Sequence, residues 1–182
     1  TGSIKKAKKL ILTAKKNGAD LVKLQTYEPR NMTINSSLKD FLVKDGLWKG
    51  YKLWDLYKEA QTPLRWQKEL FDYSKKIKIP CFSTPYDDEG VNLLKKLNSK
   101  LYKVSSFEMK DSSLVKKICS IGKPVIISTG LANLKEISEV YTVAKKSGCK
   151  QLLLLYCVSS YPAKNTDFNL NNIDILKKKF KC

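Results

Sequence analysis

Short apolar runs alternate with amphipathic stretches along most of this chain. The apolar runs lie at residues 21–27, 81–87, 101–108, 125–130 and 152–162, and each ends in polar residues. Between the runs, apolar residues recur at intervals of three and four positions, which is the spacing of one face of an α-helix. The pattern therefore predicts five strands that alternate with helices.

Local signals mark where several of the helices begin. Ser3 is a suitable N-cap for the first helix, and Thr62-Pro63 is expected to cap the next one with proline in its first position. Asn133 and Glu136 have the spacing of a capping box. Six helices are expected in all. The stretch at 27–61 matches neither period and is predicted to be a long irregular connection, of the kind that often carries function.

The order of the predicted elements indicates the fold class. Strands that are apolar on both sides and alternate with helices are typical of a parallel sheet covered on both faces. Five strands and six helices could form a doubly wound sheet. They could also form part of a (β/α)8 TIM barrel, which would make the chain a fragment. No linker divides the sequence, so residues 1–182 are treated as one domain.

Composition narrows the classes of function. The formal net charge is +18, and the lysines that supply it are spread over every predicted helix, which favours a solvated surface over a nucleic-acid or membrane site. The chain contains no histidine, so neither a histidine-dependent triad nor a histidine-bound metal can be built from it. No apolar run reaches the length of about 18 residues that a membrane span needs.

The cysteines and the first residues indicate the compartment. Cys81, Cys119 and Cys157 lie within apolar runs and are expected to pack as small core residues, which fits the reducing cytoplasm. The chain begins at Thr1 without an initiator methionine or a signal peptide, and we expect it to start within a longer protein.

Charged residues near strand ends are the first candidates for chemistry. Lys23 and Lys103 lie towards the ends of two apolar runs, where an ammonium group is costly unless it meets an anion. Such a pair could bind phosphate or carboxylate. Either amine could instead form a Schiff base, as in barrel aldolases, or simply reach solvent. Glu108 follows Lys103 closely and could handle protons.

Paired hydroxyl residues recur after four of the strands. The pairs are Ser83-Thr84, Ser105-Ser106, Ser128-Thr129 and Ser159-Ser160. One such pair alone would be ascribed to helix or turn capping. Their recurrence at corresponding positions favours a shared pocket for an oxyanion, with Tyr161 as a possible wall. Asp87-Asp88-Glu89 is more simply explained as a helix N-terminus than as a metal site.

In their order along the chain, these motifs resemble the sialic acid synthase family. The matching segments are Lys23-Leu24-Gln25-Thr26, Phe82-Ser83-Thr84-Pro85, Tyr102 to Glu108, Gly122 to Gly130 and Ser160-Tyr161-Pro162-Ala163. Residues 46–60 look most like the pseudaminic acid synthase branch. The resemblance covers nearly the whole chain. It implies the N-terminal part of an eight-stranded barrel, in which strands one, seven and eight and a C-terminal antifreeze-like domain lie outside this sequence.

The resemblance also implies a reaction. The family condenses phosphoenolpyruvate with an N-acetylated amino sugar to a nine-carbon keto acid and releases phosphate, so the chain would belong to a cytoplasmic transferase. The complete enzyme would be a homodimer that uses a divalent metal, Mn or Mg, held by residues outside this chain. In place of the metal-binding histidine of the neuraminate branch stands Tyr156, a poor ligand. Neither nucleic acid nor membrane would be a partner.

Site roles follow from the same resemblance. Lys103 and Glu108 would be catalytic, with Glu108 handling a proton or orienting a hydroxyl group. The substrate-binding residues would be Lys23, Gln25, Thr84, Ser106, Ser128, Ser159 and Tyr161. Of these, Gln25 and Tyr161 would face the sugar, and the lysines and hydroxyls would hold phosphoenolpyruvate. The alternatives are a neuraminate or legionaminate synthase, a Schiff-base barrel aldolase, and a basic nucleic-acid-binding module.

Overall fold

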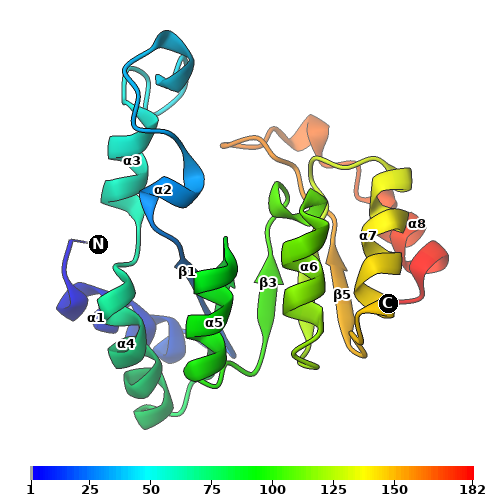
Figure 1. Cartoon of the computed structure of the whole chain (residues 1–182), viewed down its shortest axis with the longest axis horizontal. Coiled ribbons are helices and arrows are strands. Elements are labelled where there is room, and N and C mark those ends of the chain that lie inside the picture. The colour runs from blue at the N-terminus through cyan, green and yellow to red at the C-terminus, as the bar shows by residue number, and fades with distance from the viewer. Residues whose placement is uncertain (1) are drawn as a thin grey trace. The chain divides into compact units, whose positions relative to one another are not determined.

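The structure is a computed structural model that describes residues 2–182, and its contacts divide the chain into two compact units, residues 1–99 and 100–182 (Figure 1). Each unit is described by itself. Thr1, at which the sequence begins, lies outside the described residues.

The first unit contains two strands and their flanking helices. Its elements are α1 (Ile4–Lys16), β1 (Val22–Thr26), α2 (Pro29–Met32), the 3-10 turn η1 (Lys39–Phe41), α3 (Leu53–Ala60), α4 (Leu64–Lys76), β2 (Cys81–Pro85) and α5 (Asp88–Lys96). Strands β1 and β2 pair in parallel, with Val22 opposite Cys81 and Gln25 opposite Thr84. Ile11, Leu70 and Ile79 form the core where α1 and α4 pack on the strands.

The second unit repeats the same alternation with three strands. Its elements are β3 (Tyr102–Val104), η2 (Glu108–Lys110), α6 (Ser112–Cys119), β4 (Val125–Ser128), α7 (Leu134–Lys146), β5 (Leu152–Leu155), η3 (Asn165–Asp167) and α8 (Asn171–Phe180). The strand β4 pairs in parallel with both β3 and β5. Figure 1 shows this alternation in the green to red part of the chain. The five predicted strands are therefore confirmed.

Alternation along the strands separates two faces in each unit, because successive side chains of a strand point to opposite sides. In β1, Val22 and Leu24 pack against the core of α1 and α4. Lys23 and Gln25 therefore lie on the face turned away from those helices. In the second unit, Val104 and Ile127 are fully buried, and Lys103 belongs to the opposite face.

The structure corrects the predicted boundaries within residues 27–62. The connection predicted to be irregular contains α2 and α3 in addition to a turn. Helix α3 has only eight residues, none of them buried, so its periodicity is too short to stand out. Helix α4 begins at Leu64, with Pro63 as its N-cap and no side-chain cap from Thr62. The other predicted caps, Ser3 and the Asn133–Glu136 capping box, are confirmed.

An extended arm links α2 to α3. It comprises residues 33–52, and a single antiparallel bridge between Leu42 and Lys52 closes it (Figure 1). Several of its large apolar residues face outward, and Leu47 is 80% exposed. No helix among residues 2–182 is long and apolar enough to cross a membrane.

Six of the described helices have two or more lysines in their last turn. The pairs are Lys15-Lys16 in α1, Lys75-Lys76 in α4, Lys95-Lys96 in α5, Lys116-Lys117 in α6 and Lys145-Lys146 in α7, and α8 ends in Lys177-Lys178-Lys179. Positive charge at a helix C-terminus interacts favourably with the helix dipole. Because α1, α4, α6 and α7 each run back towards the start of the next parallel strand of the same unit, their lysines lie at the amino ends of the strands within each unit. Gln25, Thr84 and Ser128 lie towards the opposite, carboxyl ends of their strands.

Candidate active site

In the first unit, three candidate residues share one face of the strands β1 and β2. Gln25 is paired in register with Thr84, so their side chains point to the same side as that of Lys23. The Gln25 amide nitrogen Nε2 donates a hydrogen bond of 2.9 Å to the Tyr86 hydroxyl. Thr84 is 1% exposed, and its Oγ1 has no hydrogen-bond partner among the described residues. A buried hydroxyl of this kind is a ready partner for a ligand oxygen.

Lys23 carries its charge in a partly dehydrated setting. Although the side chain is exposed, neighbouring protein atoms displace part of the hydration of the ammonium and lower its pKa. Lys23 is the second residue of β1, so it lies nearer the amino end of the strand and not at its carboxyl end, where the sequence predicted it.

In the second unit, Lys103 and Ser128 form the centre of the candidate site. Lys103 is opposite Ile126 in the register of β3 and β4, which puts Ser128 on the same face. The Lys103 Nζ donates a hydrogen bond of 2.7 Å to Ser128 Oγ. Ser128 is 5% exposed. An ammonium group and a hydroxyl fixed together at a strand end can bind a phosphate or carboxylate oxygen jointly.

Glu108 follows β3 in the short turn η2 and is half-buried. Its Oε2 has no hydrogen-bond partner within residues 2–182. Burial raises the pKa of the Glu108 carboxyl, and its own backbone amide and the Lys103 ammonium offset part of that rise. A carboxyl group with a raised pKa and an unpartnered oxygen has the properties of a general acid or base.

Two further predicted residues meet at Gly130. The Gly130 amide donates a hydrogen bond of 3.2 Å to Ser106 Oγ. A Cβ atom on Gly130 would collide with Ser159 Oγ and would lie 2.9 Å from the Cys157 Cβ. Only glycine therefore allows this close approach of the loops that follow β4 and β5. The hydroxyls of Ser106 and Ser159 both lie beside it.

Tyr161 lies apart from these contacts. It is 84% exposed in the loop after β5, and the peptide bond from Tyr161 to Pro162 is cis. The structure therefore does not bring Tyr161 into contact with the Lys103 group.

In two of the hydroxyl pairs, one residue makes a structural hydrogen bond and the other lies on the candidate face. Ser83 Oγ and Thr26 Oγ1 are 2.7 Å apart in the buried interior, whereas Thr84 is on the candidate face. Thr129 Oγ1 donates to the Leu155 carbonyl at 2.9 Å, whereas Ser128 contacts Lys103. Of the four hydroxyl residues in these two pairs, only Thr84 and Ser128 remain candidates for binding an oxyanion.

Tyr156 is a packing residue. It lies against the apolar cluster of Ile137, Leu176 and Phe180, and it lines a pocket beside α7 and α8. That pocket contains none of the charged candidates, so we assign the chemistry to the strand ends rather than to it. Within residues 2–182 no group of three or more His, Cys, Asp or Glu side chains is placed to hold a metal ion. The described residues therefore do not fit the expected metal, which stays a prediction about residues elsewhere.

Sequence reasoning missed two polar residues that support Gln25. Gln67 on α4 is fully buried, and its Nε2 donates a hydrogen bond of 2.9 Å to the Gln25 carbonyl. Gln67 has helical spacing from Leu70 and Ser74, so it lies on the buried face of α4. A glutamine on a buried face was the sequence signal that could have identified it. Tyr86 is the first residue after β2. Its contact with Gln25 depends on how β1 and β2 pair, and the structure shows it.

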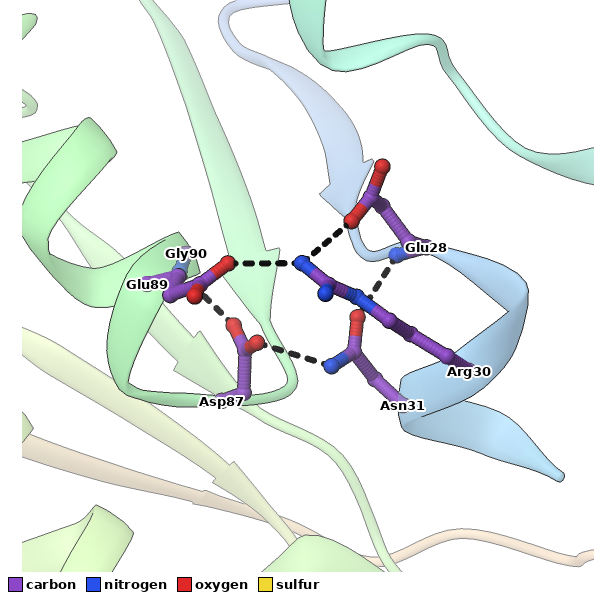
Figure 2. A network of polar contacts seen from close by, with 6 residues as sticks. All are labelled: Glu28, Arg30, Asn31, Asp87, Glu89 and Gly90. Carbon is purple, nitrogen blue, oxygen red and sulfur yellow. Dashed lines mark hydrogen bonds and ion pairs between the residues drawn. The ribbon is translucent and has the colours of Figure 1, made fainter. Parts of the chain in front are cut away.

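A polar network ties α2 to the start of α5. Figure 2 shows Arg30 between two carboxylates, with Nη2 at 2.7 Å from Glu28 Oε2 and at 2.9 Å from Glu89 Oε2. Asp87 accepts hydrogen bonds from the Gly90 amide at 2.7 Å and from Asn31 Nδ2 at 2.8 Å. The acidic segment therefore acts as a helix cap and an anchor, as favoured from the sequence.

A model of the NeuB family matches residues 10–182 of the chain. A pseudaminic acid synthase of Campylobacter jejuni is 41% identical over 98% of this chain and 52% of that protein. An N,N'-diacetyllegionaminic acid synthase of the same species is 37% identical over 99% of this chain and 54% of that protein. The chain thus spans about half the length of the curated relatives it matches.

A solved structure of a similar synthetase has the same fold over most of this chain. The N-acetylneuraminic acid synthetase of Leptospira borgpetersenii, crystallised with citrate, superposes with a TM-score of 0.83 at 29% identity and covers 98% of this chain and 57% of that protein. Together with the parallel β/α repeats, this likeness confirms the fold class expected from the sequence, part of a TIM barrel.

Proposed function

The chain belongs to the NeuB family, and from this premise we propose that its full-length protein condenses phosphoenolpyruvate with an N-acetylated amino sugar. The product would be a nine-carbon keto sugar acid, and phosphate would be released. The observation that carries the proposal is the contact of 2.7 Å between Lys103 Nζ and Ser128 Oγ at adjacent strand ends. Glu108, five residues after Lys103, has a buried oxygen without a hydrogen-bond partner among the described residues.

Binding of phosphoenolpyruvate would rely on fixed positive charge and hydroxyl groups. Lys103 and Ser128 would bind one anionic group of the substrate, and Ser106 would contribute a further hydroxyl. In the first unit, Lys23 and Thr84 offer the same two kinds of group. Groups that are already oriented stabilise charge that develops in the transition state without reorganising, which is where electrostatic catalysis gains most.

Glu108 would manage the proton in the condensation. When the enol carbon of phosphoenolpyruvate attacks the sugar aldehyde, a carbon–carbon bond forms and the aldehyde oxygen gains a proton. Water then adds to the resulting cation and loses a proton, and the intermediate collapses to the ketone as its carbon–oxygen bond to phosphate breaks and the hydroxyl proton is released. The raised pKa of Glu108 makes its protonated form more accessible, so it can supply that proton.

Several finer points belong to the same proposal. The higher identity to the pseudaminic acid synthase, 41% against 37% for the legionaminic acid synthase, favours the pseudaminic branch. We propose a cytoplasmic homodimer with phosphoenolpyruvate and an amino sugar as partners, and with neither nucleic acid nor membrane. A divalent metal, Mn or Mg, would be held by residues beyond this sequence, and no step above depends on it.

The first test compares two lysine substitutions in the full-length protein. Lys103→Ala should lower the rate of phosphate release by at least about a hundredfold, because a charged hydrogen-bond donor to the anion is lost. Lys146→Ala on the surface of α7 should leave the rate within about twofold. The measurement is phosphate release with phosphoenolpyruvate and an amino sugar. Equal rates for the two variants would contradict the proposed site.

The substrate branch is decided by the sugar supplied. Assays with the precursors of neuraminate, legionaminate and pseudaminate should give the highest kcat/KM with the pseudaminate precursor. A preference for either of the other sugars would reassign the branch and retain the reaction.

The lowered pKa of Lys23 favours one alternative, a Schiff-base aldolase. A lysine with a lowered pKa is more often the free amine, which is the nucleophile that forms an imine. Borohydride reduction in the presence of substrate distinguishes the two reactions. A covalent adduct at Lys23 or Lys103 would support the aldolase, and no adduct with continued phosphate release would support the synthase.

A further inference from the structure

Gln25 is held from two sides at the end of β1. Its backbone carbonyl accepts a hydrogen bond of 2.9 Å from Gln67 Nε2, and its side-chain Nε2 donates one of 2.9 Å to the Tyr86 hydroxyl. Gln67 is fully buried. The backbone and the carboxamide of Gln25 are therefore both oriented by the protein before any ligand arrives.

Tyr86 is itself fixed in place. Its ring packs edge-on against the ring of Tyr27, which is 3% exposed, with 5.3 Å between the ring centroids. It follows the last residue of β2 and precedes Asp87, both of whose carboxylate oxygens are engaged by Gly90 and Asn31 (Figure 2). Anchors on both sides of Tyr86 limit the directions in which its hydroxyl can point.

This arrangement determines what Gln25 can offer to a ligand. A carboxamide has two N–H donors on nitrogen and acceptor lone pairs on oxygen. The hydrogen bond to Tyr86 uses one of the two N–H donors and fixes the direction of the carboxamide, and the oxygen Oε1 remains to accept a hydrogen bond. Gln25 shares its face with Lys23 and Thr84, so the oxygen belongs to the candidate substrate side.

We infer that Tyr86 is a positioning residue, which turns the Gln25 carboxamide so that its oxygen accepts a hydrogen bond from a hydroxyl or amide N–H group of the sugar. The inference rests on the proposed function, because it assigns the sugar to Gln25. It goes further by naming the residue that sets the orientation and the kind of substrate group that is recognised.

The test is a double-mutant cycle in the full-length protein. Tyr86→Phe should raise the KM for the amino sugar about fivefold to tenfold, the cost of one misdirected hydrogen bond, and leave the KM for phosphoenolpyruvate within about twofold. In a Gln25→Leu background the same substitution should change the sugar KM by less than about twofold, because Tyr86 acts through Gln25. Tyr51→Phe, at a 45% exposed tyrosine of the arm, is the matched control.

Equal effects of Tyr86→Phe in both backgrounds would overturn the inference. A fall in kcat with both KM values unchanged would overturn it as well.

A second measurement separates this inference from the proposed function. The side-chain amide resonance of Gln25 in a nitrogen–proton correlation spectrum is assigned by its disappearance in Gln25→Leu. It should move in Tyr86→Phe and stay in place in Tyr51→Phe, and an unmoved resonance in Tyr86→Phe would refute the positioning. A wild-type protein that releases no phosphate with any amino sugar would refute the proposed function, while the resonance still decides the role of Tyr86.

Discussion

Glu108 and Glu136 lie in surroundings that shift their pKa values in opposite directions. Burial raises the pKa of Glu108 from its ordinary value near 4.5. Hydrogen bonds from Lys110 and from the Asn133 amide lower the pKa of Glu136. The folded state therefore favours the protonated form of Glu108 and the charged form of Glu136, and the pH dependence of stability follows from this difference.

We predict that the variants Glu108→Gln and Glu136→Gln diverge from each other as the pH rises. A raised folded-state pKa means that the wild type loses stability as the pH rises from the unfolded through the folded pKa of Glu108, so Glu108→Gln should gain relative to it. The stability that charged Glu136 contributes is present above its unfolded pKa. The variant Glu136→Gln lacks this contribution and should therefore become less stable than the wild type as the pH rises. Urea unfolding midpoints measured from about pH 3 to about pH 8 provide the comparison.

Each variant serves as the control for the other, because both replace a glutamate with its neutral analogue. The two differences from wild type should have opposite signs in their slopes with pH. Parallel slopes would show that the two carboxyl groups do not experience the surroundings described above.

At the residue scale, the sequence predicts the charged residues of the candidate site better than it predicts the residues that hold the site residues in place. Lys103 and Ser128 were identified because a lysine and a hydroxyl at strand ends are unusual, and the structure brings them to 2.7 Å. Tyr86 and Gln67 were not identified, because an aromatic residue after a strand and a glutamine on a helix have ordinary explanations. Their roles depend on the register of β1 and β2, which one sequence does not reveal.

Asp87 connects two elements of the first unit through one side chain. One carboxylate oxygen caps α5 through the Gly90 amide, and the other accepts from Asn31 on α2. Asp111 makes a cap of the ordinary kind, since its Oδ1 accepts from the Ser113 and Leu114 amides at the start of α6. The two aspartates thus differ by one contact between elements.

We predict that Asp87→Ala destabilises the protein more than Asp111→Ala. Loss of the cap alone costs about 1 kcal/mol, and loss of the contact with Asn31 adds about 1 kcal/mol, so Asp87→Ala should cost about 2 kcal/mol. Urea unfolding gives both values. In a cycle with Asn31→Ala, the coupling to Asp87 should be about 1 kcal/mol, and additive effects would mean that this contact contributes nothing.

At the element scale, periodicity predicted the longer helices and all five strands, and it failed where elements are short. The capping box of α7 was identified because both of its residues are visible in the sequence. Helix α3 was missed because two turns without a buried residue leave no apolar stripe. The start of α4 was misplaced by the expectation that Pro63 opens the helix, whereas its ψ of 132° keeps it outside.

The charge of the whole molecule is strongly unbalanced. The sequence contains 35 lysines and arginines against 17 aspartates and glutamates. The ion pairs within the two units, such as Lys68 with Asp72 and Lys110 with Glu136, each include at least one well-exposed side chain, so they contribute little. Repulsion among the uncompensated cations is then the larger electrostatic term.

We predict that salt stabilises the folded protein. Raising NaCl from about 0.05 M to about 0.5 M shortens the screening length and weakens repulsion, so Tm should rise by a few degrees in calorimetry. A control series in sucrose separates screening from effects of the cosolute on hydration. A Tm that falls with NaCl would show that the ion pairs outweigh the repulsion.

The lysines at the helix ends also give each unit a preferred orientation on charged materials. On a cation-exchange bead or a carboxylated sensor chip, each unit would adsorb through the amino ends of its strands, where the lysines of α1, α4, α6 and α7 lie. The carboxyl ends, with Gln25 in the first unit and Ser128 in the second, would face the liquid. Immobilisation by charge alone would thus leave the candidate substrate side accessible, without a tag or a chemical crosslinker.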